Sequence, residues 1–198
     1  MRAPPLLEGS LVDLHPFDSK YLTQEYIDWF NDPEVTKYNR HGAITYNLEL
    51  AKEYIVSTQK SSDTVVCAII VKDTARHVGN IALQKIDVIS KNAEYSIIVG
   101  NKKYWGKGIA GDASRAILRY AFSTLNLHRV YCGTSAANIP MQKLAIALGF
   151  KEEGLRKEAM YKDGVFTDVI EYGLLKSDFV SADRELLTNT NSGRKMRE

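Results

Sequence analysis

A glycine-rich segment between a strand-like run and a helix-like run constrains this chain more than any other feature. The apolar run 93–99 is followed by Gly106, Gly108 and Gly111, and apolar residues then recur at helical spacing over 109–123. Glycines let a backbone approach an anion closely, and the start of a helix presents free N–H groups with a partial positive charge. The segment therefore predicts a phosphate-binding loop that opens a helix.

The glycine spacing is literally Gly-x-Gly-x-x-Gly, which is also the spacing of a dinucleotide fingerprint. That fingerprint needs a tight strand-to-helix turn and an acidic residue after the next strand. Here five residues, 101–105, separate the strand from the glycines, and no carboxylate follows the next strand at 129–134. The Walker pattern needs Ser or Thr after Gly-Lys, and Lys107 is followed by Gly108. A nucleotide-binding oxidoreductase and a glycine-rich helix start without a ligand stay open as alternatives.

Composition sets wide bounds on the class of protein. The 198 residues are 44% apolar and 25% charged, which suffices for one sizeable core in a single domain. A net charge of +2 with dispersed Lys and Arg gives no support for nucleic-acid binding. Cys67 and Cys132 lie in apolar runs, so we expect buried free thiols in a reducing compartment. We expect a cytoplasmic protein that binds neither a metal nor a membrane.

The hydrophobic pattern predicts alternating strands and helices. Strands are expected at 11–14, 65–71, 78–86, 93–99, 129–134, 155–161 and 167–175, and helices at 21–30, 48–57, 109–123 and 141–148. Lys162-Asp163-Gly164 predicts a hairpin turn between the last two strands. We expect one domain over 1–179 and a flexible C-terminal tail over 180–198.

The order of these motifs resembles the GNAT superfamily of acetyl-CoA-dependent N-acetyltransferases. The matching segments are 29–35, 104–113, Asn138, 148–154 and 164–175, within a region from about Gly9 to about Phe179. The chain is most similar to the RimJ/RimL type, which acetylates protein N-termini and, in some relatives, amino sugars or polyamines. The resemblance implies an α+β fold with a mixed, mostly antiparallel twisted sheet. Helices would flank this sheet, and it would be splayed between its fourth and fifth strands to hold acetyl-CoA.

The resemblance also implies which residues meet acetyl-CoA. The pyrophosphate would lie on the N–H groups of the glycine loop, and the pantetheine arm would pair with the preceding strand. The expected cofactor-binding residues are Ile97, Ile98, Val99, Lys103, Gly106, Lys107, Gly108, Ile109, Ala110, Asn138 and Lys143. Lys103 stands where the family has Gln or Arg. Asn138 is alternatively a turn residue before Pro140, and Lys143 a solvated surface lysine.

Acetyl transfer requires a neutral amine, a base and a donor to the developing oxyanion. An α-amine with a pKa near ~8 is already partly neutral at pH 7, whereas a lysine amine near ~10.4 is not. Glu94 is the candidate base, acting through water, and a solvent-facing strand carboxylate is the alternative. The backbone N–H of Ile98 is the candidate oxyanion donor. The general acid stays unassigned, because Ala145 and Met141 stand where the family has Tyr and Ser.

The acceptor amine is expected to bind beside the N-terminal helical region. Trp29, Asn31 and His41 are the candidate substrate-binding residues, with core packing as the alternative for Trp29 and a solvated loop for His41. We expect an enzyme that moves an acetyl group from acetyl-CoA to a primary amine, with a protein N-terminal α-amine favoured. An amino sugar nucleotide, another small amine, a non-catalytic acetyl-CoA-binding module and a homodimer stay open.

Overall fold

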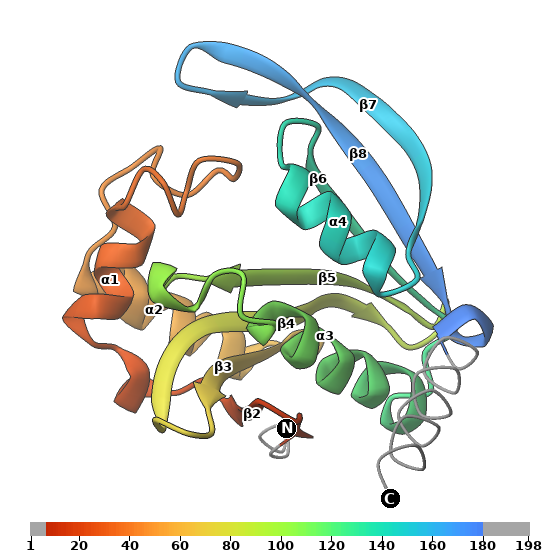
Figure 1. Cartoon of the computed structure of the whole chain (residues 1–198), viewed down its shortest axis with the longest axis horizontal. Helices are drawn as coiled ribbons and strands as arrows, with labels where there is room; N and C mark the ends of the chain where they lie inside the picture. The colour runs from red at the N-terminus through yellow and green to blue at the C-terminus, as the bar shows by residue number, and fades with distance from the viewer. Residues whose placement is uncertain (1–6, 180–198) are drawn as a thin grey trace, which may run out of the picture.

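A single eight-stranded sheet, in the order β1-β2-β3-β4-β5-β6-β8-β7, runs through the molecule (Figure 1). The computed structural model describes residues 7–179, so the tail expected over 180–198 lies outside the described residues. The strands are β1 (Leu7–Glu8), β2 (Val12–Pro16), β3 (Val65–Val71), β4 (Arg76–Asp87), β5 (Asn92–Val99), β6 (Arg129–Ser135), β7 (Lys151–Lys162) and β8 (Val165–Leu175). The helices are α1 (Gln24–Asn31), α2 (Leu48–Lys60), α3 (Ile109–Arg119) and α4 (Ile139–Ala147), with short 3₁₀ turns at Ser19–Tyr21 and Lys102–Tyr104 and a π-helical turn at Tyr120–Thr124. The predicted fold class is confirmed.

The sheet opens between β5 and β6. These two strands pair in parallel, whereas every other neighbouring pair of described strands is antiparallel. Their register extends from Asn92 opposite Arg129 to Glu94 opposite Tyr131 and stops there. Beyond Glu94, β5 keeps β4 as its neighbour on one side, and the two halves of the sheet diverge (Figure 1). The sheet is therefore splayed between the two strands expected at 93–99 and 129–134. They are the fifth and sixth strands of the structure because β1 was not predicted.

Two hydrophobic cores cover the two faces of the sheet. One contains α3 and α4 and takes Ala93, Tyr95 and Ile97 from β5. The other contains α1 and α2 and takes Ile98. Because strand side chains alternate between faces, Glu94 points to the same face as Ile98, the face of α1 and α2. The sequence left open which face of the sheet Glu94 occupies, and the structure shows that it is the face covered by α1 and α2.

The first helix begins later than the hydrophobic pattern predicted. The Thr23 hydroxyl caps α1 by accepting a hydrogen bond of 3.2 Å from the backbone N–H of Tyr26. The residues before it form a 3₁₀ turn instead of helix. The C-terminal hairpin turn is confirmed, since Asp163 (φ 51°) and Gly164 (φ 81°) both adopt the left-handed conformation that a tight hairpin turn needs.

The two cysteines are free and buried, as predicted. Burial raises the pKa of both thiols to about 12, so they stay protonated at neutral pH. Between residues 7 and 179, no helix has the length and apolar character needed to span a membrane. In the same range, no three His, Cys, Asp or Glu side chains gather as a metal site would require.

Candidate active site

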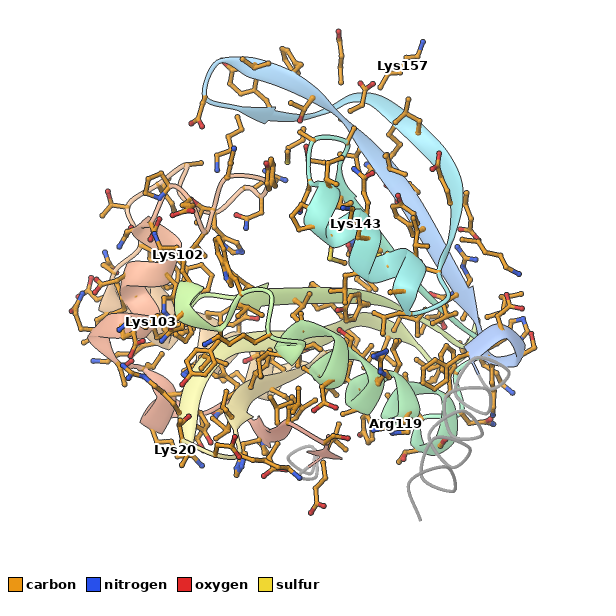
Figure 2. All side chains as sticks on the ribbon, viewed as in Figure 1. Lys20, Lys102, Lys103, Arg119, Lys143 and Lys157 are labelled. Carbon is orange, nitrogen blue, oxygen red and sulfur yellow. The ribbon has the colours of Figure 1, made fainter. Side chains whose placement is uncertain are left out.

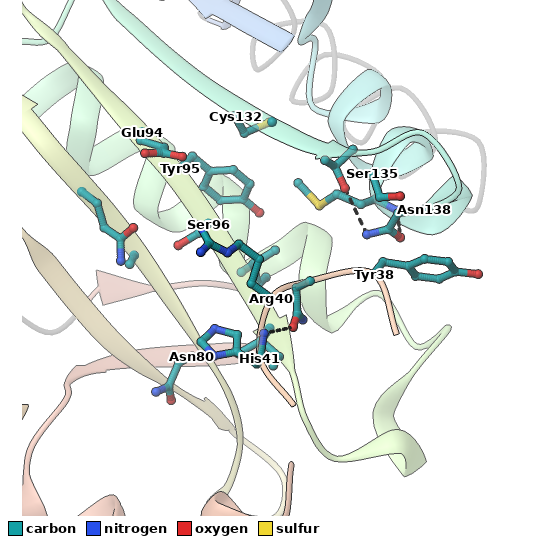
Figure 3. A pocket seen from close by; sticks show the side chains of 18 of the residues that line it. Tyr38, Arg40, His41, Asn80, Glu94, Tyr95, Ser96, Cys132, Ser135 and Asn138 are labelled. Carbon is teal, nitrogen blue, oxygen red and sulfur yellow. Dashed lines mark hydrogen bonds between the residues drawn. The ribbon is translucent and has the colours of Figure 1, made fainter. Parts of the chain in front are cut away.

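A cavity of about 650 Å³ lies where β5 and β6 diverge (Figure 3). One wall is formed by residues of β5, of β6 and of the start of α4, and the opposite wall by the loop after α1. The lining includes Glu94, Tyr95, Ser96, Ile97 and Ile98 of β5, Cys132–Ser135 of β6, Asn138 and Met141, and Tyr38, Asn39, Arg40 and His41 of the loop. Rings of Tyr26, Phe30, Tyr46 and Tyr54 and residues of β7 complete it. The opening of the sheet is therefore a cavity lined by polar and aromatic side chains.

The glycine loop forms an uncapped helix start beside this opening. Gly106 (φ 72°) and Gly108 (φ 80°) adopt left-handed conformations, and Gly108 is the N-cap of α3. No side chain within residues 7–179 caps this helix end. The first-turn N–H groups of Ile109 and Ala110 thus have no capping side chain and can donate to an anion, and the phosphate expected from the sequence stays a prediction. The loop itself lies outside the lining of the cavity.

Three lysines expected at the cofactor, Lys103, Lys107 and Lys143, are exposed. Lys103 and Lys143 extend into solvent from the loop and from α4 (Figure 2). The Lys107 ammonium lies 5.6 Å from the centre of the Tyr104 ring. Lys102 instead forms ion pairs of 2.8 Å with Asp32 and 2.7 Å with Glu34, which attach the loop to the end of α1.

The edge of β5 that faces the opening has no neighbouring strand beyond Glu94 in the described chain. Its backbone groups from Ile97 to Val99 are the ones expected to pair with pantetheine. One of them is already used, because the indole N–H of Trp105 donates to the Val99 carbonyl at 2.6 Å. The remaining edge can accept an extended, amide-rich ligand in the manner of an added strand.

Asn138 orders the turn between β6 and α4. Its side-chain carbonyl accepts from the backbone N–H of Met141 at 3.2 Å, and its amide donates to the Thr134 hydroxyl at 3.1 Å (Figure 3). These contacts make Asn138 the N-cap of α4, and they are compatible with the alternative of a turn residue before Pro140. Asn138 nevertheless lines the cavity.

Glu94 lines the cavity at the point where the sheet opens. Its carboxylate is half-buried and lies 2.7 Å from the Lys85 ammonium. This contact raises the pKa of Lys85 and holds the carboxylate in place. Lys85 lies in the β4 irregularity that follows Gln84, with φ 50°. Glu94 is the candidate base of the sequence analysis, and it lies in the lining with this one ion pair.

His41 lies in the opposite wall. Its ring packs edge-on against Phe30, with ring centres 4.8 Å apart. Loss of solvation, with a further contribution from the Lys162 ammonium, lowers the pKa of His41, so the ring is neutral at pH 7. Its loop is fixed by Gly42 (φ 82°), where an added Cβ would come within 2.7 Å of the Thr36 hydroxyl.

The other two residues expected at the acceptor lie elsewhere. Trp29 is buried in the core of α1 and α2 and lies outside the lining of the cavity. Its ring fills the space beside Gly100, where an added Cβ would be 2.0 Å from it. The Asn31 side chain accepts from the N–H of Tyr46 and donates to its carbonyl, both at 2.8 Å. Asn31 therefore holds together the two ends of the loop after α1, which forms the wall of the cavity opposite β5.

The β7–β8 hairpin closes over the opening and reaches the loop after α1 (Figure 1). The Lys162 ammonium donates to the backbone carbonyls of Thr36, Asn39 (3.1 Å) and His41 (3.4 Å). Residues more than 120 positions apart in the sequence are thus joined. Sequence reasoning missed this contact, because a lysine in a hairpin turn gives no signal of a distant partner.

Two arginines that line the cavity were also missed. Arg156 of β7 lies 2.5 Å from the Glu171 carboxylate of β8. Arg40, next to His41, points from the loop across the cavity toward β5, in the direction of Ser96 (Figure 3). The one sequence feature that could have identified Arg40 as a cavity residue was its position next to His41, a candidate substrate-binding residue.

Comparisons with known proteins agree with this geometry. The family model described as acetyltransferase (GNAT) domain matches residues 12–151. The spermidine N(1)-acetyltransferase of Vibrio cholerae serotype O1 is 31% identical over 177 residues, 89% of this chain and 93% of that protein. A Bacillus licheniformis protein named "Uncharacterized N-acetyltransferase p20" is 31% identical over 156 residues, 76% of this chain and 85% of that protein. The structure of spermidine N-acetyltransferase from Vibrio cholerae in complex with CoA and spermine shares the fold, with a TM-score of 0.78 at 22% identity, covering 86% of this chain and 99% of that one.

Proposed function

Because the chain belongs to the GNAT family and is an acetyl-CoA-dependent N-acetyltransferase, we propose that its acceptor is the α-amine of a protein or peptide N-terminus. The charged side chains that line the cavity are the observation that supports this proposal. Among the described residues that line it, Glu94 is the one carboxylate, and it is already paired with Lys85. Arg40 and Arg156 line the same cavity. A polycation gains little there, whereas a single α-amine needs no cluster of carboxylates.

A polyamine is the second candidate acceptor. The identity of 31% to a spermidine N(1)-acetyltransferase over 89% of this chain favours it. The charge of Arg40 opposes it, because two or more ammonium groups would lie in a cavity whose other lining charges, Glu94 and Arg156, are already paired. We place the enzyme in the RimJ/RimL type on the sequence motifs, and in the cytoplasm on its free, buried thiols.

For acetyl-CoA, we assign the pyrophosphate to the N–H groups from Gly106 to Ala110, with Lys103, Lys107 and Lys143 around them. The uncapped start of α3 supports this assignment. The pantetheine arm would extend along the free edge of β5 from Ile97 to Val99, past Asn138. This route leads from the helix start to the cavity, where the acceptor amine would meet the thioester.

The proposed reaction follows from the groups in the cavity. The neutral amine nitrogen attacks the thioester carbon, the C–N bond forms, and the C–S bond breaks to release the CoA thiolate. The proton lost by the amine passes through water to Glu94, and solvent protonates the thiolate, which is a tolerable leaving group at a pKa near ~8.5. The backbone N–H of Ile98 would stabilise the oxyanion. His41, neutral at pH 7, lies across the cavity from this base.

Thiol release from acetyl-CoA tests the acceptor. The panel contains short peptides with Ser or Ala N-termini, spermidine and an amino sugar nucleotide, with products identified by mass. Acetylated peptide N-termini would support the proposal, and transfer to spermidine alone would replace it with the polyamine function. Binding of acetyl-CoA without transfer to any acceptor would favour a binding module.

A pair of variants tests the base. Glu94→Gln should lower kcat/KM by about 100-fold, a common contribution of a general base. Glu53→Gln, on the exposed face of α2, is the matched control and should leave the rate unchanged. A rate for Glu94→Gln within twofold of the native enzyme would remove Glu94 from the mechanism.

A further inference from the structure

Arg40 carries a charge into the cavity without a protein partner. It forms no hydrogen bond or ion pair with the described residues, in contrast to the other charged side chains of the lining. Glu94 is matched by Lys85 at 2.7 Å and Arg156 by Glu171 at 2.5 Å. Arg40 is thus the one unmatched charge among the described lining residues.

The direction of Arg40 matters as much as its charge. Its side chain points from the loop toward β5 and the Ser96 side of the cavity, whereas an uncommitted surface arginine would extend away from the protein (Figure 3). The adjacent backbone is held from two directions. Lys162 binds the carbonyls of Asn39 and His41, and Asn39 accepts a hydrogen bond of 2.9 Å from the His41 N–H. The backbone of the loop is therefore held in place, and from it the exposed Arg40 guanidinium offers a planar set of donors to a ligand.

A guanidinium in this position pairs best with a carboxylate or a phosphate, because its parallel N–H groups match two anionic oxygens. Acetyl-CoA also carries phosphates. However, the uncapped start of α3 that is assigned to them lies outside the lining of this cavity. Arg40 instead lies in the wall assigned to the acceptor.

We propose that Arg40 selects acceptors that carry an anionic group next to the reacting amine. This inference rests on the proposed N-terminal acetyltransferase function and names its substrate class: peptide N-termini with an acidic side chain in the first residues. The acidic group would occupy the Arg40 side of the cavity while the amine lies toward Glu94. An N-terminus followed by lysine would place a second cation beside Arg40 and be disfavoured.

Three peptides that differ at one position test the inference. They begin Ser-Glu, Ser-Ala and Ser-Lys and are otherwise identical, and kcat/KM is measured for each with saturating acetyl-CoA. The native enzyme should prefer Ser-Glu to Ser-Lys by about tenfold or more, because a charge-assisted pair is gained by one and a like-charge contact by the other. Arg40→Gln should bring the ratio close to one, and Arg40→Glu should reverse it.

Lys37→Gln is the matched control, since it removes a cation from the same loop at an exposed position outside the cavity lining. It should preserve the native preference. Equal use of the three peptides by the native enzyme, or a ratio that Arg40→Gln leaves unchanged, would overturn the inference and leave the proposed function intact. Transfer to spermidine with none of the peptides acetylated would overturn the proposed function itself. A peptide with phosphoserine at the second position then shows whether phosphate is recognised as well as carboxylate.

Discussion

The buried hydroxyl groups of Tyr95 and Ser114 lie 2.6 Å apart and join β5 to α3 directly behind the cavity. Ser114 also donates to the Ala110 carbonyl at 2.6 Å, so its single proton is used and Tyr95 must be the donor between them. The strand that opens the sheet and the helix that begins at the glycine loop are therefore tied by one polar chain inside an apolar core.

This proton assignment predicts unequal effects of the two truncations. Tyr95→Phe removes one hydrogen bond and should cost about 1 kcal/mol of unfolding free energy. Ser114→Ala should cost more, about 2 kcal/mol, because it leaves the Tyr95 hydroxyl buried without an acceptor. The double variant should cost less than the sum of the two. Urea unfolding checks the order, and a smaller cost for Ser114→Ala than for Tyr95→Phe would refute the assignment.

The glycines of the phosphate loop should respond differently to alanine. Gly108 has φ 80°, so Gly108→Ala should cost about 1 kcal/mol of stability and also weaken acetyl-CoA binding. Gly111 lies inside α3, and a Cβ there meets only ordinary contacts of 3.6 Å with Arg115 and 4.0 Å with Leu144. Gly111→Ala should therefore raise stability by about 0.5 to 1 kcal/mol.

Thermal unfolding and calorimetric titration with coenzyme A check both glycine variants. A loss of stability in Gly111→Ala would show that the third glycine is required by the fold. A Gly108→Ala protein that binds coenzyme A as well as the native protein would remove this loop from the phosphate site.

The strands, the glycine loop and the hairpin could be predicted because their signals are local. The apolar run 65–71 coincides with β3, and the glycines at 106 and 108 have the positive φ that their use in a loop requires. The start of α1 was misplaced because one capping hydroxyl, Thr23, decided it. The spacing of apolar residues contains no information about a side-chain hydrogen bond that caps a helix.

The walls of the cavity depend instead on contacts between distant segments. Lys162 meets the loop after α1 only because the β7–β8 hairpin folds back over the opening. Trp29 was a reasonable acceptor residue by type, yet its ring packs in the core against Gly100, where an added Cβ would overlap it. The sequence shows which residues have side chains suited to binding or catalysis, but the fold determines which of them line the same cavity.

His77 should make stability depend on pH in mildly acidic solution. Its half-buried ring packs among Phe17, Tyr21, Tyr26 and Trp29, and loss of solvation lowers its pKa, although contacts to Asn80 and the Gly79 carbonyl act in the opposite direction. The unfolded chain then binds a proton more readily than the folded one. The contribution is fully present above the unfolded pKa of about 6.5 and is lost as pH falls from there toward the folded pKa.

Thermal unfolding at a series of pH values between 7.5 and 5 measures this loss. The native protein should lose stability across the interval, and His77→Gln should show a shallower slope whatever its stability at pH 7.5. The pKa of His41 is also lowered, so it adds to the slope and His41→Asn is the comparison. An identical slope in native protein and His77→Gln would contradict the assignment.

The contact of Lys162 with the loop after α1 should govern acceptor binding more than acetyl-CoA binding. Its ammonium holds the carbonyls of Thr36, Asn39 and His41, and no other side chain is recorded on those three carbonyls among the described residues. Lys162→Met keeps the length of the side chain and removes these charge-assisted bonds. The loop should then sample more positions, and the KM for a peptide acceptor should rise about tenfold with little change in kcat.

Lys157→Met is the matched control, because Lys157 is an exposed lysine of the same strand (Figure 2). It should leave the KM for the acceptor unchanged, and both variants should bind coenzyme A like the native enzyme, since the glycine loop lies outside the cavity. A KM that rises equally in the two variants would indicate a general effect of charge on the hairpin. A KM that stays constant in Lys162→Met would mean that the loop holds its position without the hairpin, through its own contacts at Asn31, Thr36 and Gly42.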